Sequence, residues 1–344
     1  MARNHAELQV KMSDVALLAG VSVMTVSNVI NGKPRVSAET RLRVLEVIAE
    51  SGYKVNVSAR RLRSGKTGTV ALIIPRFDHP YFGELAARMS EELAGSDRHL
   101  VVEQTNAQAE SELAALSLSQ IQSYDGVILS AVGLTFAEID RLKTSVPIVL
   151  LGEHEMPKKF DHIALDNVGG AQLATEHLIA TGASRILMIG GSSDPQDKGG
   201  MTGKRYQGWK NALLAAGMPV RPEFVIPLEK LETFDAYQAL RNLISQRVEF
   251  DGVFTVTDSV GIGALAALSD EGIDVPGQVQ VVGFDNLEIS RHVRPSLTTI
   301  DPDHSETIAN AYRLLMHRIE HGYDLMPPEH IIGSVRLLKG GSTR

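Results

Sequence analysis

The twenty residues from Met12 to Asn31 read MSDVALLAGVSVMTVSNVIN, which places one glycine between two short apolar-periodic runs. Ser13 and Ser22 each stand just before one of these runs, where a hydroxyl accepts a hydrogen bond from the first turn of a helix. Gly20 stands where the first helix must end and the chain must turn, a position that favours positive φ. The stretch therefore predicts a helix-turn-helix, the arrangement that presents its second helix to a DNA groove.

A third helix is expected after this pair. Ser37 is its predicted N-cap, and apolar residues recur behind it at helical spacing. We expect these side chains, which are Leu42, Leu45 and either Ile48 or Ala49, to cover the first two helices. Three helices in about fifty residues form a small but feasible domain.

The net charge of −7 conceals a strong asymmetry along the chain. Residues 1–68 hold 11 Lys and Arg against 5 Asp and Glu, whereas the remaining residues hold 23 against 36. Phosphate binding needs only local positive charge, so a basic head on an acidic body favours one DNA-facing end. A solvated basic face is the alternative that charge alone leaves open.

Composition limits the protein to ordinary globular classes. At 344 residues with 43% hydrophobic residues, the chain is expected to form two or three domains. No apolar run approaches the roughly 18 residues of a membrane span, and the N-terminus lacks the apolar core of a secretory signal. The absence of cysteine removes disulfides and thiolate metal sites. We therefore expect a cytoplasmic protein with no membrane partner.

From Thr69 onward, short β-rich runs alternate with amphipathic segments. This alternation predicts parallel sheets covered by helices on both faces, and about 270 residues of it favour two doubly wound lobes. Ligands of such sheets bind beyond the carboxyl ends of the strands. The expected strands are 70–74, 100–102, 126–129, 148–151, 163–165, 186–189, 253–256 and 279–282. The expected helices are 82–93, 170–179, 206–214 and 262–268.

With its motifs in this order, the chain resembles the lactose-repressor/galactose-repressor (LacI/GalR) family of bacterial transcription regulators over nearly its full length. The motifs that carry the resemblance are SDVA (13–16), GVS (20–22), TVSNVIN (25–31), DN (166–167), GW (208–209), GFD (283–285) and LTTI (297–300). The resemblance implies a small all-α helix-turn-helix head plus an α/β sensor of two doubly wound parallel-sheet lobes, similar to periplasmic binding proteins and joined by three crossovers. It also implies a homodimer on a near-palindromic operator. The expected regions are a flexible arm (1–11), a helix-turn-helix DNA-binding domain (12–54), a hinge helix or linker (55–68) and a two-lobed effector-binding and dimerisation domain (69–344).

By this resemblance, the second helix reads DNA bases with Val23, Met24 and Asn28. Val23 and Met24 offer only apolar contact, for instance with thymine methyl groups, whereas Asn28 can pair with a base edge. The alternative is that Val23 or Met24 belongs to the core. Ser22 and Thr25 are expected to contact phosphates, which fix register without specifying sequence. The full set of expected DNA contacts is Ser13, Ser22, Val23, Met24, Thr25, Ser27, Asn28, Asn31, Tyr53, Asn56, Ala59, Arg60, Leu62 and Arg63.

The basic segment at residues 53–68, YKVNVSARRLRSGKTG, resembles the family's hinge helix. It is too short to be a stable helix by itself, so we expect its folding to depend on a partner. The resemblance implies that Leu62 of each subunit enters the minor groove, while Ala59 lets the two helices approach and the arginines neutralise phosphates. A flexible basic linker is the alternative. Val55 stands where the family commonly has proline, which leaves the register of this helix open.

Arg205 and Asp258 are the best candidates for effector contacts, because a guanidinium and a carboxylate that face each other suit a polyhydroxylated ligand. Asp258 is equally placed to be a helix N-cap, and Arg205 to be a surface residue. Phe82 is placed to stack on a sugar face, although such an aromatic is also typical of a core. The full set of expected effector contacts is Phe82, Ser192, Arg205, Trp209, Asp258 and Asp285.

No catalytic constellation, cofactor motif or metal-ligand spacing accompanies these residues, so we expect neither an enzyme nor a cofactor. The expected function is sequence-specific repression of carbohydrate-utilisation genes, controlled by a small-molecule effector, a sugar, bound between the two lobes. One alternative is the same regulator responding to a purine or a protein corepressor. A solute-binding protein is less favoured, because that class predicts a signal peptide and no basic head.

Overall fold

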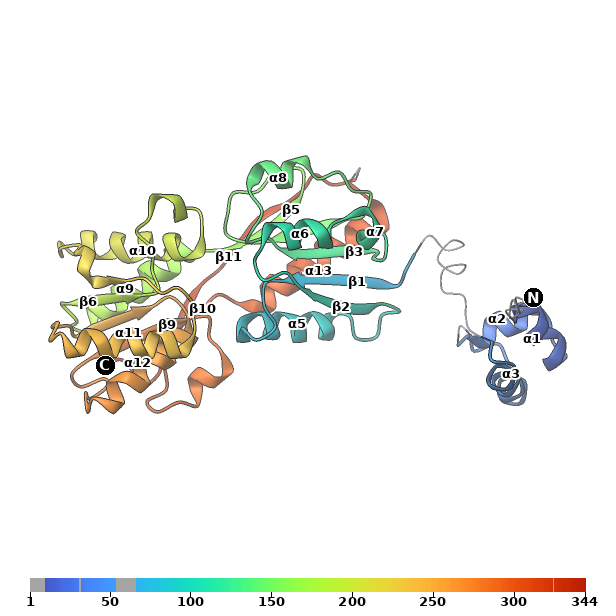
Figure 1. Ribbon diagram of the computed structural model, residues 1–344, viewed down its shortest axis with the longest axis horizontal. Helices are drawn as coiled ribbons and strands as arrows, with labels where there is room; N and C mark the ends of the chain where they lie inside the picture. Colours follow the sequence, from blue (N-terminus) through green and yellow to red (C-terminus); the bar gives the residue numbers. More distant parts are fainter. Residues whose placement is uncertain (1–9, 31, 54–65, 324) are drawn as a thin grey trace, which may run out of the picture. The chain divides into compact units, whose positions relative to one another are not determined.

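The computed structural model describes residues 10–30, 32–53, 66–323 and 325–344. The chain divides into two compact units, Met1–Lys66 and Thr67–Arg344. The described part of the first unit is a three-helix domain (Figure 1). Its helices are α1 Met12–Ala19, α2 Val23–Ile30 and α3 Ala38–Ser51.

The turn between α1 and α2 is closed by backbone hydrogen bonds. Gly20 adopts a φ of 63°, and the amide of Val21 donates to the carbonyl of Ala16 at 3.0 Å. The two helices meet at 103° and share a small buried core with α3. The predicted helix-turn-helix is therefore confirmed. In the described ranges, no single helix is long and apolar enough to cross a membrane, and α1 and α2 meet that criterion only as this bent pair.

Two of the three predicted N-cap residues, Ser22 and Ser37, cap their helices in the structure. Ser22 accepts from the amide of Thr25 at 3.1 Å, and Ser37 accepts from the amide of Thr40 at 3.3 Å. The N-cap expectation for Ser13 is wrong, because Lys11 is the N-cap of α1 and Ser13 lies inside its first turn.

The inner face of α3 is shifted from the expected one. Leu42 and Leu45 are 63% and 47% exposed, whereas Val44 is completely buried. Val47 and Ile48 pack beside Val44 against the other two helices. The apolar residues of α3 fit two overlapping helical stripes, and only contact with α1 and α2 selects the one that is buried.

The second unit contains two six-stranded sheets, each at the centre of one lobe (Figure 1). The strands of the N-terminal lobe are β1 Thr69–Ile74, β2 His99–Gln104, β3 Gly126–Ser130, β4 Ile148–Leu151, β5 Asp161–Leu165 and β11 His330–Gly333. Its helices are α5 Pro80–Glu92, α6 Ala109–Ala115, α7 Leu118–Ile121, α8 Phe136–Arg141 and α13 His304–His321.

The N-terminal sheet has the order β11-β5-β4-β3-β1-β2, and all its pairs are parallel. Alternate strand residues enter two separate buried clusters, one with α5 and α13 and the other with α6, α7 and α8. In β1, for example, Leu72 joins the first cluster and Ile73 the second. The sheet is thus covered on both faces, as the continuous apolar strands predicted.

The C-terminal lobe repeats this plan with one reversed edge strand. Its strands are β6 Ile186–Ile189, β7 Val225–Ile226, β8 Gly252–Thr255, β9 Gln280–Phe284, β10 Thr298–Asp301 and β12 Arg336–Leu338, and its α-helices are α9 Asn167–Ala180, α10 Met201–Ala215, α11 Thr233–Ser245 and α12 Asp258–Asp270. The order is β12-β10-β9-β8-β6-β7, with only β12 antiparallel to its neighbour. Helix α9 packs with α10, and α11 packs with α12.

The chain passes between the lobes three times. The passages lie between β5 and α9, between β10 and α13, and between β11 and β12. The three crossovers implied by the resemblance are therefore confirmed. Strands β7, β10, β11 and β12 were not expected, because β7 is very short, β11 and β12 are half-exposed, and β10 reads TTID with three polar side chains.

Candidate effector and DNA-binding sites

Helix α2 presents two apolar side chains to solvent. Val23 and Met24 are 48% and 74% exposed, whereas Val26 and Val29 turn inward and are buried. The alternative that Val23 or Met24 belongs to the core is therefore wrong. Asn28 is half-buried on the same helix. Base contact by these side chains stays a prediction, and the exposed surface that it requires is present.

The first turn of α2 is organised by two hydroxyls. The Oγ of Ser22 and the Oγ1 of Thr25 lie 2.9 Å apart, in addition to the amide hydrogen bond between these residues. Backbone amides at the start of a helix attract anions, so this turn suits a phosphate. Ser27 is half-buried farther along the helix.

Ser13 and Tyr53 lie at the edges of the described head. Ser13 is exposed and its hydroxyl donates to Asp14 at 3.4 Å, whereas Tyr53 packs against the head's apolar core. The other expected contacts lie outside the described residues. They are Asn31, Asn56, Ala59, Arg60, Leu62 and Arg63, and Val55 lies outside them as well.

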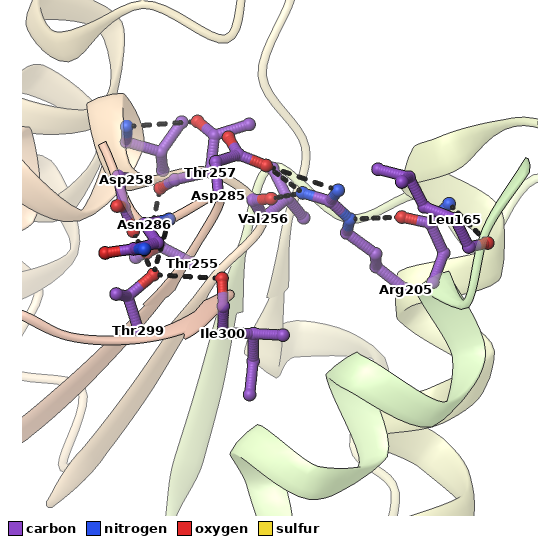
Figure 2. Close-up of polar contacts among 12 residues, drawn as sticks. Leu165, Arg205, Thr255, Val256, Thr257, Asp258, Asp285, Asn286, Thr299 and Ile300 are labelled. Carbon is purple, nitrogen blue, oxygen red and sulfur yellow. Dashed lines mark hydrogen bonds and ion pairs between the residues drawn. The ribbon is translucent and has the colours of Figure 1, made fainter. Parts of the chain in front are cut away.

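In the sensor, α10 carries Arg205 into the interior, where its guanidinium has several partners (Figure 2). Nε donates to Oδ1 of Asn167 at 2.7 Å, and Nη1 donates to the carbonyl of Val256. Oδ1 of Asp285 lies 3.4 Å from the guanidinium, whose central carbon is 3.5 Å from the centre of the Phe284 ring. Arg205 is buried, so the alternative of a surface residue is wrong.

Asp285, rather than Asp258, is the carboxylate that faces Arg205. Asp285 and Asn286 follow β9 with φ values of 111° and 55°, a backbone that costs about 1–3 kcal/mol per residue and is concentrated at functional sites. Burial raises the pKa of Asp285 to about 8, although the charge of Arg205 lowers it. Burial also lowers the pKa of Arg205. The pair is therefore desolvated and held in place by its surroundings.

Asp258 is buried in the C-terminal lobe, where its carboxylate joins three segments by hydrogen bonds (Figure 2). Oδ2 accepts from the amide of Leu287 at 2.8 Å and from the hydroxyl of Ser290 at 2.7 Å, and Oδ1 accepts from Thr299 at 2.6 Å. The N-cap of α12 is Thr257, so the N-cap alternative for Asp258 is wrong. Its expected pairing with Arg205 is also wrong, because the segment after β9 occupies Oδ2 and Thr299 of β10 occupies Oδ1.

Trp209 belongs to the core of the C-terminal lobe and has no exposed surface. A Cβ at the preceding Gly208 would overlap the carbonyl oxygen of Val168, so α10 lies very close to α9 and turns the indole inward. This burial contradicts the expected effector contact by Trp209. Ser192 is half-buried, and its Oγ accepts from the amide of Asp194 at 3.3 Å.

Aromatic rings gather at the start of α5. The rings of Tyr81 and Phe82 are 4.8 Å apart, and those of His79 and Phe82 are 5.6 Å apart, both edge to face. Tyr81 also contacts the ring of His304 at 5.0 Å. Phe82 is partly buried against the N-terminal core, so it combines the packing role with a remaining exposed edge.

Further contacts at the centre of the sensor join the two lobes. Arg76, after β1, forms an ion pair with Glu232 at 3.2 Å. Lys204 donates to the carbonyl of Glu153, and Asn167 donates to the Glu153 carboxylate. Burial raises the pKa of Glu153. Sequence reasoning missed these residues, although Arg76 and Glu153 each follow the end of a parallel strand, where ligands are expected.

Together these groups supply donors, acceptors and ring edges around Arg205, which is what recognition of a polar ligand requires. In the part of the chain that the structure describes, no group of three or more His, Cys, Asp or Glu side chains is arranged to hold a metal ion.

Each of the two units matches a known protein family. Residues 11–56 match the model for bacterial regulatory proteins of the lacI family, and residues 67–334 match that for periplasmic binding proteins and the sugar-binding domain of the LacI family. Catabolite control protein A of Priestia megaterium is 32% identical over 311 residues, which cover 90% of this chain and 92% of the relative.

Two solved structures share the fold across both units. The transcriptional regulator CelR in complex with cellobiose is 29% identical with a TM-score of 0.69, and the match covers 97% of this chain and 99% of that chain. The lac repressor dimer bound to operator and the anti-inducer ONPF is 22% identical with a TM-score of 0.78, covering 97% and 98% of the two chains. The chain belongs to the LacI family of DNA-binding transcriptional regulators, which are not enzymes.

Proposed function

We propose that this regulator is a cytoplasmic homodimeric repressor of carbohydrate-utilisation genes, and that a sugar bound between the lobes beside Arg205 controls it. The observation that carries the proposal is the buried polar cluster of Arg205, Asn167 and Asp285, which draws its members from helices and loops at the lobe junction. A related regulator of 29% identity is known in complex with cellobiose, which supports a sugar as the ligand class.

The chemistry of the cluster suits hydroxyl groups. A fixed guanidinium donates in set directions, while the carboxylates of Asp285 and Glu153 accept. Phe82 contacts the ring of Tyr81 and is only partly buried, so it can offer apolar contact to a sugar ring. Arg205 already has a carboxylate partner, so a neutral ligand fits better than one that brings further negative charge.

Control follows from the contacts that join the lobes. A ligand that binds Arg205 in one lobe and Glu153 in the other favours one relative orientation of the two sheets. Such a ligand shifts the equilibrium only by its difference in affinity for the two orientations. The chain of the head enters the sensor at β1, so a change in the N-terminal lobes of a dimer alters the spacing of the two heads.

On the DNA side, two heads of a symmetric dimer bind the half-sites of a near-palindromic operator. In this proposal Val23, Met24 and Asn28 read bases, and Ser22 and Thr25 hold phosphates. Leu62 enters the minor groove at the centre of the site.

The effector proposal is tested by a thermal-shift screen of the full-length protein with monosaccharides, disaccharides and purines. Operator DNA is first selected from a random duplex pool, and each hit is then added to the operator complex. We expect a sugar to raise the melting temperature and to change operator affinity. Stabilisation by a purine alone identifies the alternative effector class, and a stabilising sugar without effect on operator affinity contradicts the switch.

Variants show where a hit binds. Phe82→Ala and Glu153→Gln are expected to weaken the sugar-induced shift. Arg185→Gln is the matched control, because Arg185 pairs with Glu249 on the exposed surface of the C-terminal lobe. An equal shift in all three variants places the ligand elsewhere.

A further inference from the structure

A cavity of about 350 Å³ is lined by α5, the segment after β9, the end of β10, the start of α13 and the start of β12. Its walls carry charges of both signs. The arginines are Arg88 on α5, Arg291 after β9 and Arg336 at the start of β12. No Phe, Tyr or Trp side chain lines this cavity, so it offers no broad aromatic surface to a sugar ring or a nucleobase.

Two of the three guanidinium groups are neutralised within the cavity wall. Arg88 pairs with Glu84 at 2.5 Å and donates to the hydroxyl of Ser305 at 2.6 Å. Arg336 pairs with Asp301 at 2.7 Å. These pairs fix the outline of the site and leave the remaining charges for a ligand.

Three other charged groups form no salt bridge in the described ranges, although Asp303 caps α13 and its charge acts on Arg336. Arg291 donates only to the amide oxygen of Asn286, at 3.0 Å. Asp303 accepts from the amide of Glu306 at 3.0 Å, and Glu288 has neither a hydrogen bond nor an ion pair in the part of the chain that the structure describes. One cation and two carboxylates therefore face the cavity without a salt bridge among the described residues.

The wall shows two further signs of a built site. Asn286 and Asp303 have positive φ values of 55° and 49°. This backbone conformation is strained for residues other than glycine and persists only where the surrounding structure imposes it. His304 is 3% exposed, and its Nε2 donates to the carbonyl of Asp285 at 2.6 Å. Its Nδ1 is buried without a hydrogen-bond partner among the described residues.

We propose that this cavity binds a small zwitterion of amino-acid size, with its carboxylate on Arg291 and its ammonium group between Glu288 and Asp303. The carboxylate of a zwitterion matches Arg291, and its ammonium group matches Glu288 and Asp303. Because two carboxylates face one guanidinium, a second cationic group on the ligand is favoured. A simple anion meets two free carboxylates in the same space and is repelled by them.

The site is connected to the effector cluster through one residue. The carbonyl of Asp285 accepts from His304 in the cavity wall, and its carboxylate faces Arg205. Arg291 donates to Asn286, the residue after Asp285, so a ligand held by Arg291 acts on the segment that positions Asp285. Binding in the two sites is expected to be coupled, and the coupling is reciprocal.

The test measures binding of L-lysine, glycine and L-glutamate to the full-length protein by calorimetry, with inorganic phosphate as the anion probe. We expect affinity to fall from L-lysine to glycine to L-glutamate. Arg291→Gln and Glu288→Gln should each weaken L-lysine about tenfold, the effect of losing one charge-assisted hydrogen bond. Both side chains are exposed, so the variants are expected to fold.

Arg294→Gln is the matched control, because Arg294 is an exposed arginine of the same segment and bonds only to nearby carbonyls. Unchanged L-lysine affinity in Arg291→Gln, or binding of phosphate alone, overturns the proposal. A change in oligomeric state of Arg291→Gln with unaltered L-lysine binding assigns these residues to a subunit contact instead. None of these outcomes affects the sugar proposal, whose probes are sugars and purines and whose variants are Phe82→Ala and Glu153→Gln.

Discussion

Arg318 and Asp161 form a two-pronged ion pair across 157 positions of sequence, and neither side chain has any exposed surface. Nε and Nη2 of Arg318 donate to the two carboxylate oxygens at 2.7 and 2.9 Å. The guanidinium also donates to the carbonyls of Met326 and Pro327. The pair thus fixes α13, and the chain that follows it, to the start of β5 in the N-terminal lobe.

Arg318→Ala is therefore expected to destabilise the sensor by about 3–5 kcal/mol, because it leaves the Asp161 carboxylate buried without its charge partner. Chemical denaturation of the full-length protein measures this difference. Arg313→Ala on the same helix is the control. Its pair with Glu329 is largely exposed, so we expect a loss below about 1 kcal/mol. Equal losses in both variants contradict the structural role of the buried pair.

Gly208 and Gly83 offer a matched pair of helix glycines. A Cβ at Gly208 would overlap the carbonyl oxygen of Val168, and α9 must move to admit it. Gly208→Ala is expected to cost about 1–3 kcal/mol by overpacking. At Gly83 on α5 a Cβ meets nothing within 4 Å, so Gly83→Ala is expected to be neutral or to stabilise by up to about 1 kcal/mol. Melting temperatures of the two variants check the contrast, and a stable Gly208→Ala protein refutes the close helix contact.

Asp258 predicts a specific pH dependence of stability. Burial raises its pKa to about 6, despite the hydrogen bonds from Thr299, Ser290 and Leu287, whereas an unfolded aspartate titrates near about 3.9. A raised pKa in the folded state means that folding favours the protonated form. The resulting stability is fully present below about pH 4 and is lost as the pH rises through about 6.

The size of this effect is about 3 kcal/mol between those limits. Other carboxylates also titrate in this range, so the measurement is the difference between wild type and Asp258→Asn in unfolding free energy from pH 4 to 7. We expect the advantage of the wild type to shrink as the pH rises. A constant difference over that range shows that Asp258 does not titrate there.

In DNA binding, Asn28→Ala is expected to change which operator variants bind, because an amide that pairs with a base edge distinguishes sequences. Ser22→Ala is expected to weaken binding evenly, since a phosphate contact carries no base information. Binding to a set of single-base operator variants measures both. If the two variants lose affinity equally on every sequence, the assigned division between base and phosphate contacts is wrong.

Local pattern was enough to predict much of the fold. Apolar spacing, Gly20 and the caps at Ser22 and Ser37 predicted the head, because a helix terminus is specified within a few residues. Continuous apolar runs likewise predicted the buried strands of both sheets. The helices α5, α9, α10 and α12 begin two to five residues before the expected apolar runs, since their first turns contain proline, glycine or polar residues that interrupt the apolar pattern.

The candidate site was predicted less completely. Arg205 and Asp285 are both among the predicted site residues, but the predicted partner of Arg205 is Asp258. Nothing in the sequence indicates which of the two carboxylates turns toward a distant guanidinium. The positive φ of Asp285 is imposed by the loop in which it lies. Trp209 was assigned to the ligand site because its burial depends on the close approach of α10 to α9.

By itself, the sequence determined the helix-turn-helix, the basic head and the alternation of strands and helices, since these depend on neighbours in the chain. Only the tertiary structure decided that Val44 rather than Leu42 enters the head's core, that Asp285 faces Arg205, and that the short strands β11 and β12 return to different lobes. Each of these depends on contacts between residues far apart in sequence, where local periodicity carries no information.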